Sequence, residues 1–147
     1  MIPLTLATAL KNAGLIWRTS NHDFFAVPER GMDDKVFVLA DMMAYTELVQ
    51  GWPVVSFHGT AEWALDYILT TDVVWLPTEE QLRDELIQLL ETTGAAYQVA
   101  LTCRLDDVRC SITIEAETLE FPAATAGEAY GQAVLHLLES QNLPDEV

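Results

Sequence analysis

The stretch that decides the fold is Tyr97–Glu115, which reads YQVALTCRLDDVRCSITIE. Apolar and polar residues alternate on both sides of its central Asp106-Asp107 pair, a pattern typical of two antiparallel strands joined by a tight turn. One face of the resulting hairpin collects the apolar side chains of Tyr97, Val99, Leu101, Cys103, Leu105, Val108, Cys110, Ile112 and Ile114. The alternation therefore predicts a β-hairpin that buries one face.

A two-residue turn at Asp106-Asp107 places Arg104 opposite Arg109 on the polar face of this hairpin. Because like charges destabilise a cross-strand pair, something has to compensate these two guanidinium groups. Nearby carboxylates or a bound anionic ligand would each do so, and both readings stay open. The same register places Cys103 opposite Cys110 on the apolar face, where we expect buried free thiols in a reducing compartment.

Beyond the hairpin, the alternation changes phase between Ala116 and Leu119, which predicts a bulge or bend before Phe121. Thr125 and Glu128 then form a capping box that opens the last helix. Apolar residues recur along that helix at i, i+3, i+4 and i+7, so it should pack on the apolar face of the hairpin.

At the other end of the chain, the pattern predicts a helix from Pro3 to Ala13, ended by Gly14 in a left-handed conformation. Two short apolar runs follow, Leu15–Thr19 and Phe24–Val27, separated by residues that favour turns. These runs predict a second hairpin.

Between the two ends, a unit consisting of an apolar strand, a capping residue and a helix occurs three times. The helix after the third cap is the clearest, because Thr78 and Gln81 form a capping box and Gly94 ends it. The expected strands are Val36–Ala40, Val54–Phe57 and Val73–Leu76, and the expected caps are Asp41, Thr60 and Thr78.

These elements together predict an α+β fold in a single globular domain spanning residues 1–147. We expect a mixed sheet of about six or seven strands with helices packed on it, including the C-terminal hairpin and helix. The alternative is a small doubly wound α/β domain, which requires the three central strands to be parallel.

The net charge of -16 is the most unusual bulk property of the chain. Residues 1–60 carry four basic and six acidic side chains, whereas residues 61–147 carry three basic and seventeen acidic ones. Direct binding to nucleic-acid phosphates is therefore disfavoured. The acidic half is either a solvated surface or a contact for a basic protein partner. The leading functional hypothesis is a non-catalytic interaction or regulatory module that binds such a partner.

The alternative function is an anionic-ligand binding protein or an enzyme. If the three central strands are parallel, then Asp41, His58, Thr60 and Thr78 all lie at the strand ends where α/β sheets bind ligands. His58 is the weak catalytic candidate, since a histidine there could act as an acid or base. Helix capping alone also explains Asp41, Thr60 and Thr78 without any ligand.

The sequence lacks the common motifs of enzymes, metal sites, cofactor sites and membrane segments. It has no phosphate-binding loop, dinucleotide fingerprint, nucleophile elbow or metal-ligand spacing, so we predict no metal and no cofactor and lean away from an enzyme. No apolar run is long enough to span a membrane and no basic segment opens the chain, so we expect a cytoplasmic protein. Self-association into a homo-oligomer stays open.

Overall fold

The computed structural model describes residues 1–28, 35–40, 44–57 and 67–142. The chain divides into two compact units, one formed by Met1–Leu15 with Pro77–Val147 and the other by Ile16–Leu76. We call the first the helical unit and the second the inserted unit, because the second interrupts the first along the chain. No helix in the described ranges is long and apolar enough to cross a membrane.

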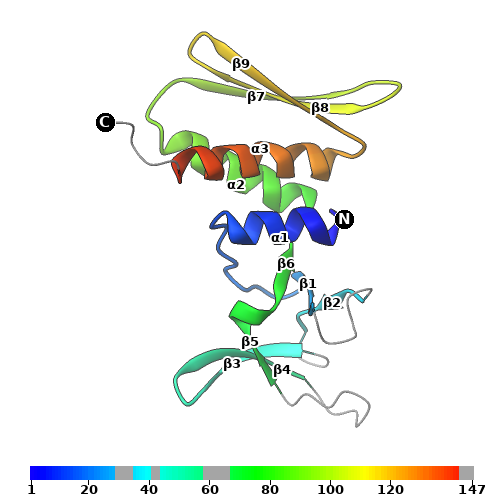
Figure 1. Ribbon diagram of the computed structural model, residues 1–147, viewed down its shortest axis with the longest axis vertical. Coiled ribbons are helices and arrows are strands. Elements are labelled where there is room, and N and C mark those ends of the chain that lie inside the picture. The colour runs from blue at the N-terminus through cyan, green and yellow to red at the C-terminus, as the bar shows by residue number, and fades with distance from the viewer. Residues whose placement is uncertain (29–34, 41–43, 58–66, 143–147) are drawn as a thin grey trace. The chain divides into compact units, whose positions relative to one another are not determined.

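The helical unit consists of a three-stranded sheet and three helices (Figure 1). The sheet has the order β7-β8-β9, with β8 antiparallel to both neighbours. Helices α2 and α3 cover one face of the sheet, and α1 packs against α3. The bounds are α1 Leu4–Asn12, α2 Glu79–Glu91, β7 Tyr97–Cys103, β8 Val108–Ile114, β9 Glu117–Ala123 and α3 Ala126–Gln141.

The ends of these helices agree with the sequence prediction. Thr78 and Gln81 bond each other reciprocally at the start of α2, with N···O distances of 2.9 and 3.3 Å. At the start of α3 the Thr125 hydroxyl accepts the Glu128 backbone N–H at 3.2 Å, which is one of the two hydrogen bonds of the predicted capping box. After α1, Gly14 has a φ of 110°, a conformation that glycine adopts without steric cost.

The predicted packing of the last helix on the hairpin is confirmed. Helix α3 contacts both β8 and β9 and buries Ala129, Tyr130, Ala133 and Val134. At Gly131, a Cβ atom would lie only 2.9 Å from the Leu6 side chain of α1, so the absent side chain allows these two helices to approach closely.

The hairpin has the predicted faces but not the predicted register. Cys103 pairs with Val108 and Thr102 with Arg109, so each β7 residue lies opposite a residue two positions earlier than expected. The turn is centred on Leu105-Asp106, closed by a hydrogen bond from the Arg104 N–H to the Asp107 carbonyl at 2.8 Å. The predicted pairs Arg104–Arg109 and Cys103–Cys110 are therefore wrong.

The phase change after Ile114 comes from a turn and not from a bulge. Strands β8 and β9 pair without interruption from Val108 with Ala123 to Ile114 with Glu117. Glu115, in the two-residue connection between them, has a φ of 56°. The bulge predicted before Phe121 is therefore absent from these paired strands.

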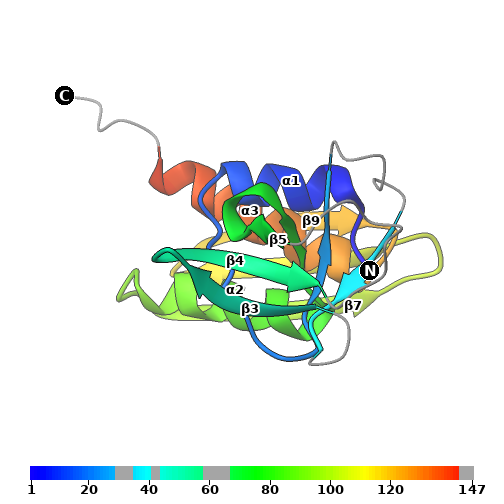
Figure 2. The ribbon, with the colours of Figure 1, turned by 90° about the horizontal axis from the view of Figure 1, so that it is seen from below.

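The inserted unit contains two further three-stranded antiparallel sheets, with orders β2-β1-β6 and β3-β4-β5. Figure 2 shows β3 and β4 side by side as a hairpin. The buried core of the inserted unit is made of Phe25, Val27, Phe37, Leu39, Ala44, Val55 and Val73, with Trp17 packed against it. The bounds are β1 Phe24–Ala26, β2 Phe37–Val38, β3 Ala44–Val49, β4 Trp52–Phe57, β5 Tyr67–Leu69 and β6 Val74–Leu76, with a 3-10 helix at Thr70–Asp72.

Three elements predicted in this unit are wrong. Leu15–Thr19 forms no strand, and β1 pairs instead with β2 and β6. Ala44–Val49, expected within the helix after Asp41, is a strand because Gln50 and Gly51 both have positive φ and turn the chain into a tight hairpin. Tyr67–Leu69, expected at the end of the helix after Thr60, is also a strand.

The α+β class predicted from the sequence is confirmed. The single mixed sheet of six or seven strands is wrong, because the described strands form three separate sheets. The doubly wound alternative is also wrong, since every pairing between these strands is antiparallel.

Candidate functional site

Of the four strand-end residues proposed for an anionic ligand, the structure places one. Thr78 is the N-cap of α2, and its hydroxyl accepts the Gln81 N–H. Asp41, His58 and Thr60 lie outside the described residues. The ligand site near His58 therefore stays a prediction, and capping accounts for the one member that is described.

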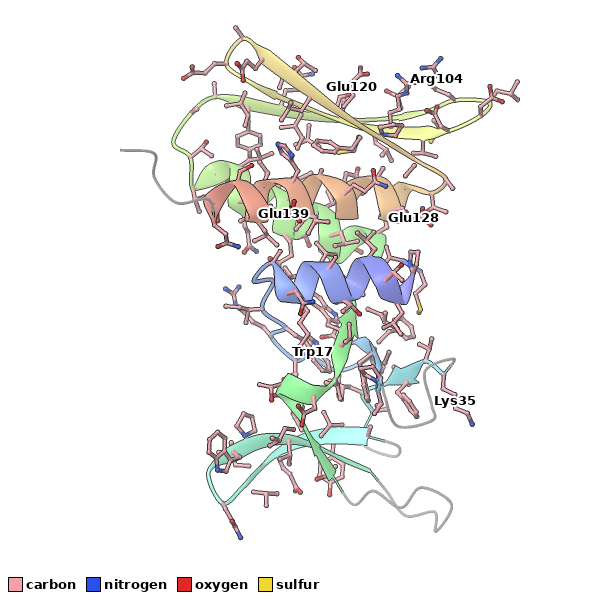
Figure 3. The ribbon with its side chains drawn as sticks, in the orientation of Figure 1. Trp17, Lys35, Arg104, Glu120, Glu128 and Glu139 are labelled. Atoms are coloured by element: carbon pink, nitrogen blue, oxygen red, sulfur yellow. The ribbon has the colours of Figure 1, made fainter. Side chains whose placement is uncertain are left out.

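The second candidate pair, Arg104 and Arg109, belongs to an ionic cluster on the face of the β7-β8-β9 sheet away from the helices. Asp107 is its centre, with a carboxylate oxygen 2.9 Å from Nε of Arg109 and the other 3.8 Å from Nε of Arg104. Glu120 of β9 lies 3.3 Å from Nη1 of Arg109. Figure 3 shows Arg104 and Glu120 projecting from this open face.

This geometry follows from the observed register. Residues i and i+2 of an extended chain lie on the same face, so Asp107, just before β8, lies beside Arg109 and opposite Arg104, just after β7. Glu120 pairs with Ser111 and lies diagonally across from Arg109. The sequence prediction missed Glu120 because it did not extend the pairing to β9.

The cluster supplies the compensation that the sequence analysis required. The hydrogen bond and ion pair to Asp107 raise the pKa of the Arg109 guanidinium, with a smaller contribution from Glu120. The two arginines do not face each other, since a carboxylate lies between them. Carboxylates within the same unit therefore compensate both charges, and binding of an anion at this pair stays a prediction.

The cysteines do not form a disulfide. Cys110 is buried, while Cys103 is exposed at the end of β7, which corrects the expectation that both are buried. Burial raises the pKa of the Cys110 thiol from 9.0 to about 11, so this thiol is a poor nucleophile near neutral pH. Burial likewise raises the pKa of Tyr130, which packs nearby on α3.

A buried carboxylate that the sequence analysis did not single out lies in the inserted unit. Asp23 is only 4% exposed, and its Oδ2 accepts the Trp17 indole N–H and the Ser20 backbone N–H, each at 2.9 Å. His22 precedes it in the turn with a φ of 72°. The sequence signal was the Ser20–Asp23 turn itself, since aspartate side chains commonly accept backbone N–H groups in turns.

Within the residues described, no group of three or more histidine, cysteine or acidic side chains is arranged to hold a metal ion. His136 is exposed on α3, with its ring centroid 5.5 Å from that of Phe121. No protein-family model, curated protein or solved structure matches this chain.

Proposed function

We propose that this protein is a non-catalytic interaction or regulatory module whose acidic surface binds a basic protein partner. The observation that carries the proposal is the uneven charge of -16, with seventeen acidic and three basic side chains after residue 60. Of those three basic residues, Arg104 and Arg109 form ion pairs within their own sheet. They therefore do little to balance the other carboxylates of the acidic half.

The C-termini of the three helices lie at the same end of the helical unit. Helices α1 and α3 run in the same direction, since Gly127 and Gly131 of α3 face Ile2 and Leu6, and the Asn142 side chain donates to the Ala13 carbonyl at 2.7 Å. Helix α2 runs the same way (Figure 1). A helix C-terminus carries about half a negative charge. Helix α1 has Lys11 in its last turn, whereas neither α2 nor α3 has a basic residue there.

Acidic side chains add to these three helix ends. Glu91 lies in the last turn of α2, and the Glu115 N–H bonds the Ala96 carbonyl just beyond it. Glu117 opens β9 opposite Ile114, and Glu139 lies near the end of α3. We call Glu91, Glu115, Glu117 and Glu139 the acidic end, and expect lysine and arginine side chains of the partner to contact it.

The test compares two charge-matched triple variants in binding experiments from native lysate and then with the purified partner. Neutralising the acidic end (Glu115→Gln, Glu117→Gln, Glu139→Gln) should weaken binding, and raising the salt concentration should weaken binding of the unchanged protein steeply. Neutralising the same number of exposed carboxylates elsewhere (Glu80→Gln, Asp84→Asn, Asp106→Asn) should have a smaller effect. Recovery of no partner at either low or high ionic strength would contradict the proposed function.

A further inference from the structure

The two outer strands of the β7-β8-β9 sheet differ in how they expose their edges. Strand β9 carries Glu117, Glu120 and Pro122, and charges and proline are common means of keeping an edge strand from pairing with another chain. Strand β7, Tyr97–Cys103, reads YQVALTC and has no charge, no proline and no glycine. Only the β7 edge therefore lacks these protecting residues.

The backbone groups on the outer edge of β7 follow from the pairing with β8. The Arg104 N–H bonds the Asp107 carbonyl and the Glu115 N–H bonds the Ala96 carbonyl, so even-numbered residues exchange hydrogen bonds with β8. In an antiparallel pair these positions alternate, so odd-numbered residues direct their N–H and C=O groups to the outer edge. Within the described chain, that edge is not paired with another strand; the outward residues are Tyr97, Val99, Leu101 and Cys103.

This edge is complementary to itself. When two β7 strands run antiparallel about a two-fold axis at Ala100, all seven residues pair and each outward N–H meets an outward C=O. Val99 then lies opposite Leu101 on the helix-covered face, while Gln98 lies opposite Thr102 on the open face. Ala100 meets its own copy, so the centre of the contact holds two small side chains and no charge.

We propose that the β7 edge is a self-association surface, on which a second copy of this chain adds its own β7 to form a continuous six-stranded sheet. A second copy is favoured over a basic partner strand because β7 itself carries no carboxylate that would attract one. The proposal is independent of the proposed function. It also predicts the opposite response to salt, because two chains of charge -16 repel each other and screening brings them together.

A disulfide placed at the two-fold axis tests the register directly. Ala100→Cys in a Cys103→Ser background puts two thiols at a non-hydrogen-bonded pair, where the Cα atoms are about 4.5 Å apart and a disulfide fits. Thr102→Cys in the same background is the matched control, since both positions are exposed on β7. In the proposed dimer, residue 102 of one copy lies opposite residue 98 of the other, so the two introduced cysteines are four residues, about 13 Å, apart along the strands.

With oxidised glutathione as oxidant, two Ala100→Cys thiols lose two electrons and two protons to form one disulfide, and the oxidant is reduced to two glutathione thiols. We expect a covalent dimer of the full-length chain for Ala100→Cys and little for Thr102→Cys. Equal crosslinking of the two variants would overturn the proposed register.

A charge placed on the axis tests the surface without any cysteine chemistry. Ala100→Glu brings two carboxylates together and should raise the dimer dissociation constant at least about tenfold by analytical ultracentrifugation. Thr118→Glu adds the same charge on β9 and should leave it nearly unchanged. A wild-type chain that stays monomeric at about 100 μM in both low and high salt would overturn the proposal, whether or not a basic partner binds.

Discussion

Replacing Asp23 with alanine should destabilise the inserted unit more than any other single change of an acidic residue in its described part. The side chain is 4% exposed and its Oδ2 accepts two hydrogen bonds, from the Trp17 indole and from the Ser20 backbone. The same residue immediately precedes β1, and its carbonyl accepts the Leu39 N–H at 2.9 Å. Its carboxylate therefore holds the segment before β1 against the core.

The expected magnitude follows from those two bonds. A hydrogen bond to a charged group contributes about 1.5 to 3 kcal/mol, and a buried donor left without an acceptor costs about 1 to 3 kcal/mol. Asp23→Ala should therefore lower the free energy of unfolding by about 3 to 5 kcal/mol. Asp23→Asn keeps an oxygen acceptor but loses the charge, so we expect about half of that loss.

Tryptophan fluorescence during urea unfolding measures this loss selectively. All four tryptophans, at positions 17, 52, 63 and 75, lie within the inserted unit, while the described α-helices all lie in the helical unit. Fluorescence therefore reports the inserted unit, and circular dichroism at the helix band reports the helical unit. With an m-value of about 1.5 kcal/mol/M, a loss of about 3 to 5 kcal/mol should lower the fluorescence midpoint by about 2 to 3 M urea.

Asp72→Ala is the matched control, because Asp72 is an exposed carboxylate of the same unit and its removal should change stability by no more than about 0.5 kcal/mol. If Asp23→Ala and Asp72→Ala shift the fluorescence midpoint equally, the two hydrogen bonds to Asp23 do not hold the unit together. The reasoning would then be refuted.

Three further predictions concern other parts of the chain. Thr78→Ala removes the capping box of α2 and should cost about 1 kcal/mol by circular dichroism, and an unchanged midpoint would contradict it. Gln50→Asn, at a φ of 52°, should stabilise the β3–β4 hairpin by about 0.5 kcal/mol in the fluorescence transition, whereas destabilisation would argue against a left-handed turn there. In the native protein at pH 8, iodoacetamide should modify exposed Cys103 before buried Cys110. The native pKa of Cys110, about 11, exceeds the value of 9.0 for an exposed thiol. The contribution of this thiol to the free energy of unfolding is therefore present below pH 9 and is lost as the pH rises toward 11. Over that range, Cys110→Ala should lose less stability than the unchanged protein.

Local chemistry predicted the helix starts and the class of fold. Each helix cap depends on two residues only three positions apart, Thr78 with Gln81 and Thr125 with Glu128, and the structure contains both caps. The sheet arrangement needed contacts between distant residues, since β1 pairs with β6 about fifty residues further along the chain. Nothing in the alternation of either strand specifies that partner.

The helix expected after Asp41 shows a different cause of error. The apolar content of Ala44–Val49 was compatible with helix, but the Gln50-Gly51 pair that follows adopts the two positive φ angles of a tight hairpin turn. The segment is therefore a strand because of residues outside it. Of the predicted ligand site, Asp41, His58 and Thr60 lie outside the described residues, so the structure reaches only Thr78.

Alternation of apolar and polar residues predicted the faces of β7 and β8 but not the register in which they pair. A shift of two positions keeps every side chain on its face, so the pattern predicted the correct faces for both strands and could not distinguish the two registers. Electrostatics distinguishes them: the register centred on Asp106-Asp107 sets Arg104 against Arg109, whereas the observed register inserts the Asp107 carboxylate between them. The same shift leaves Leu105 at the turn, 99% exposed, where the other register would have placed it on the apolar face. The observed register therefore leaves one leucine exposed and sets the Asp107 carboxylate, just before β8, against both arginines, so the hydrophobic pattern alone did not determine the register of this sheet.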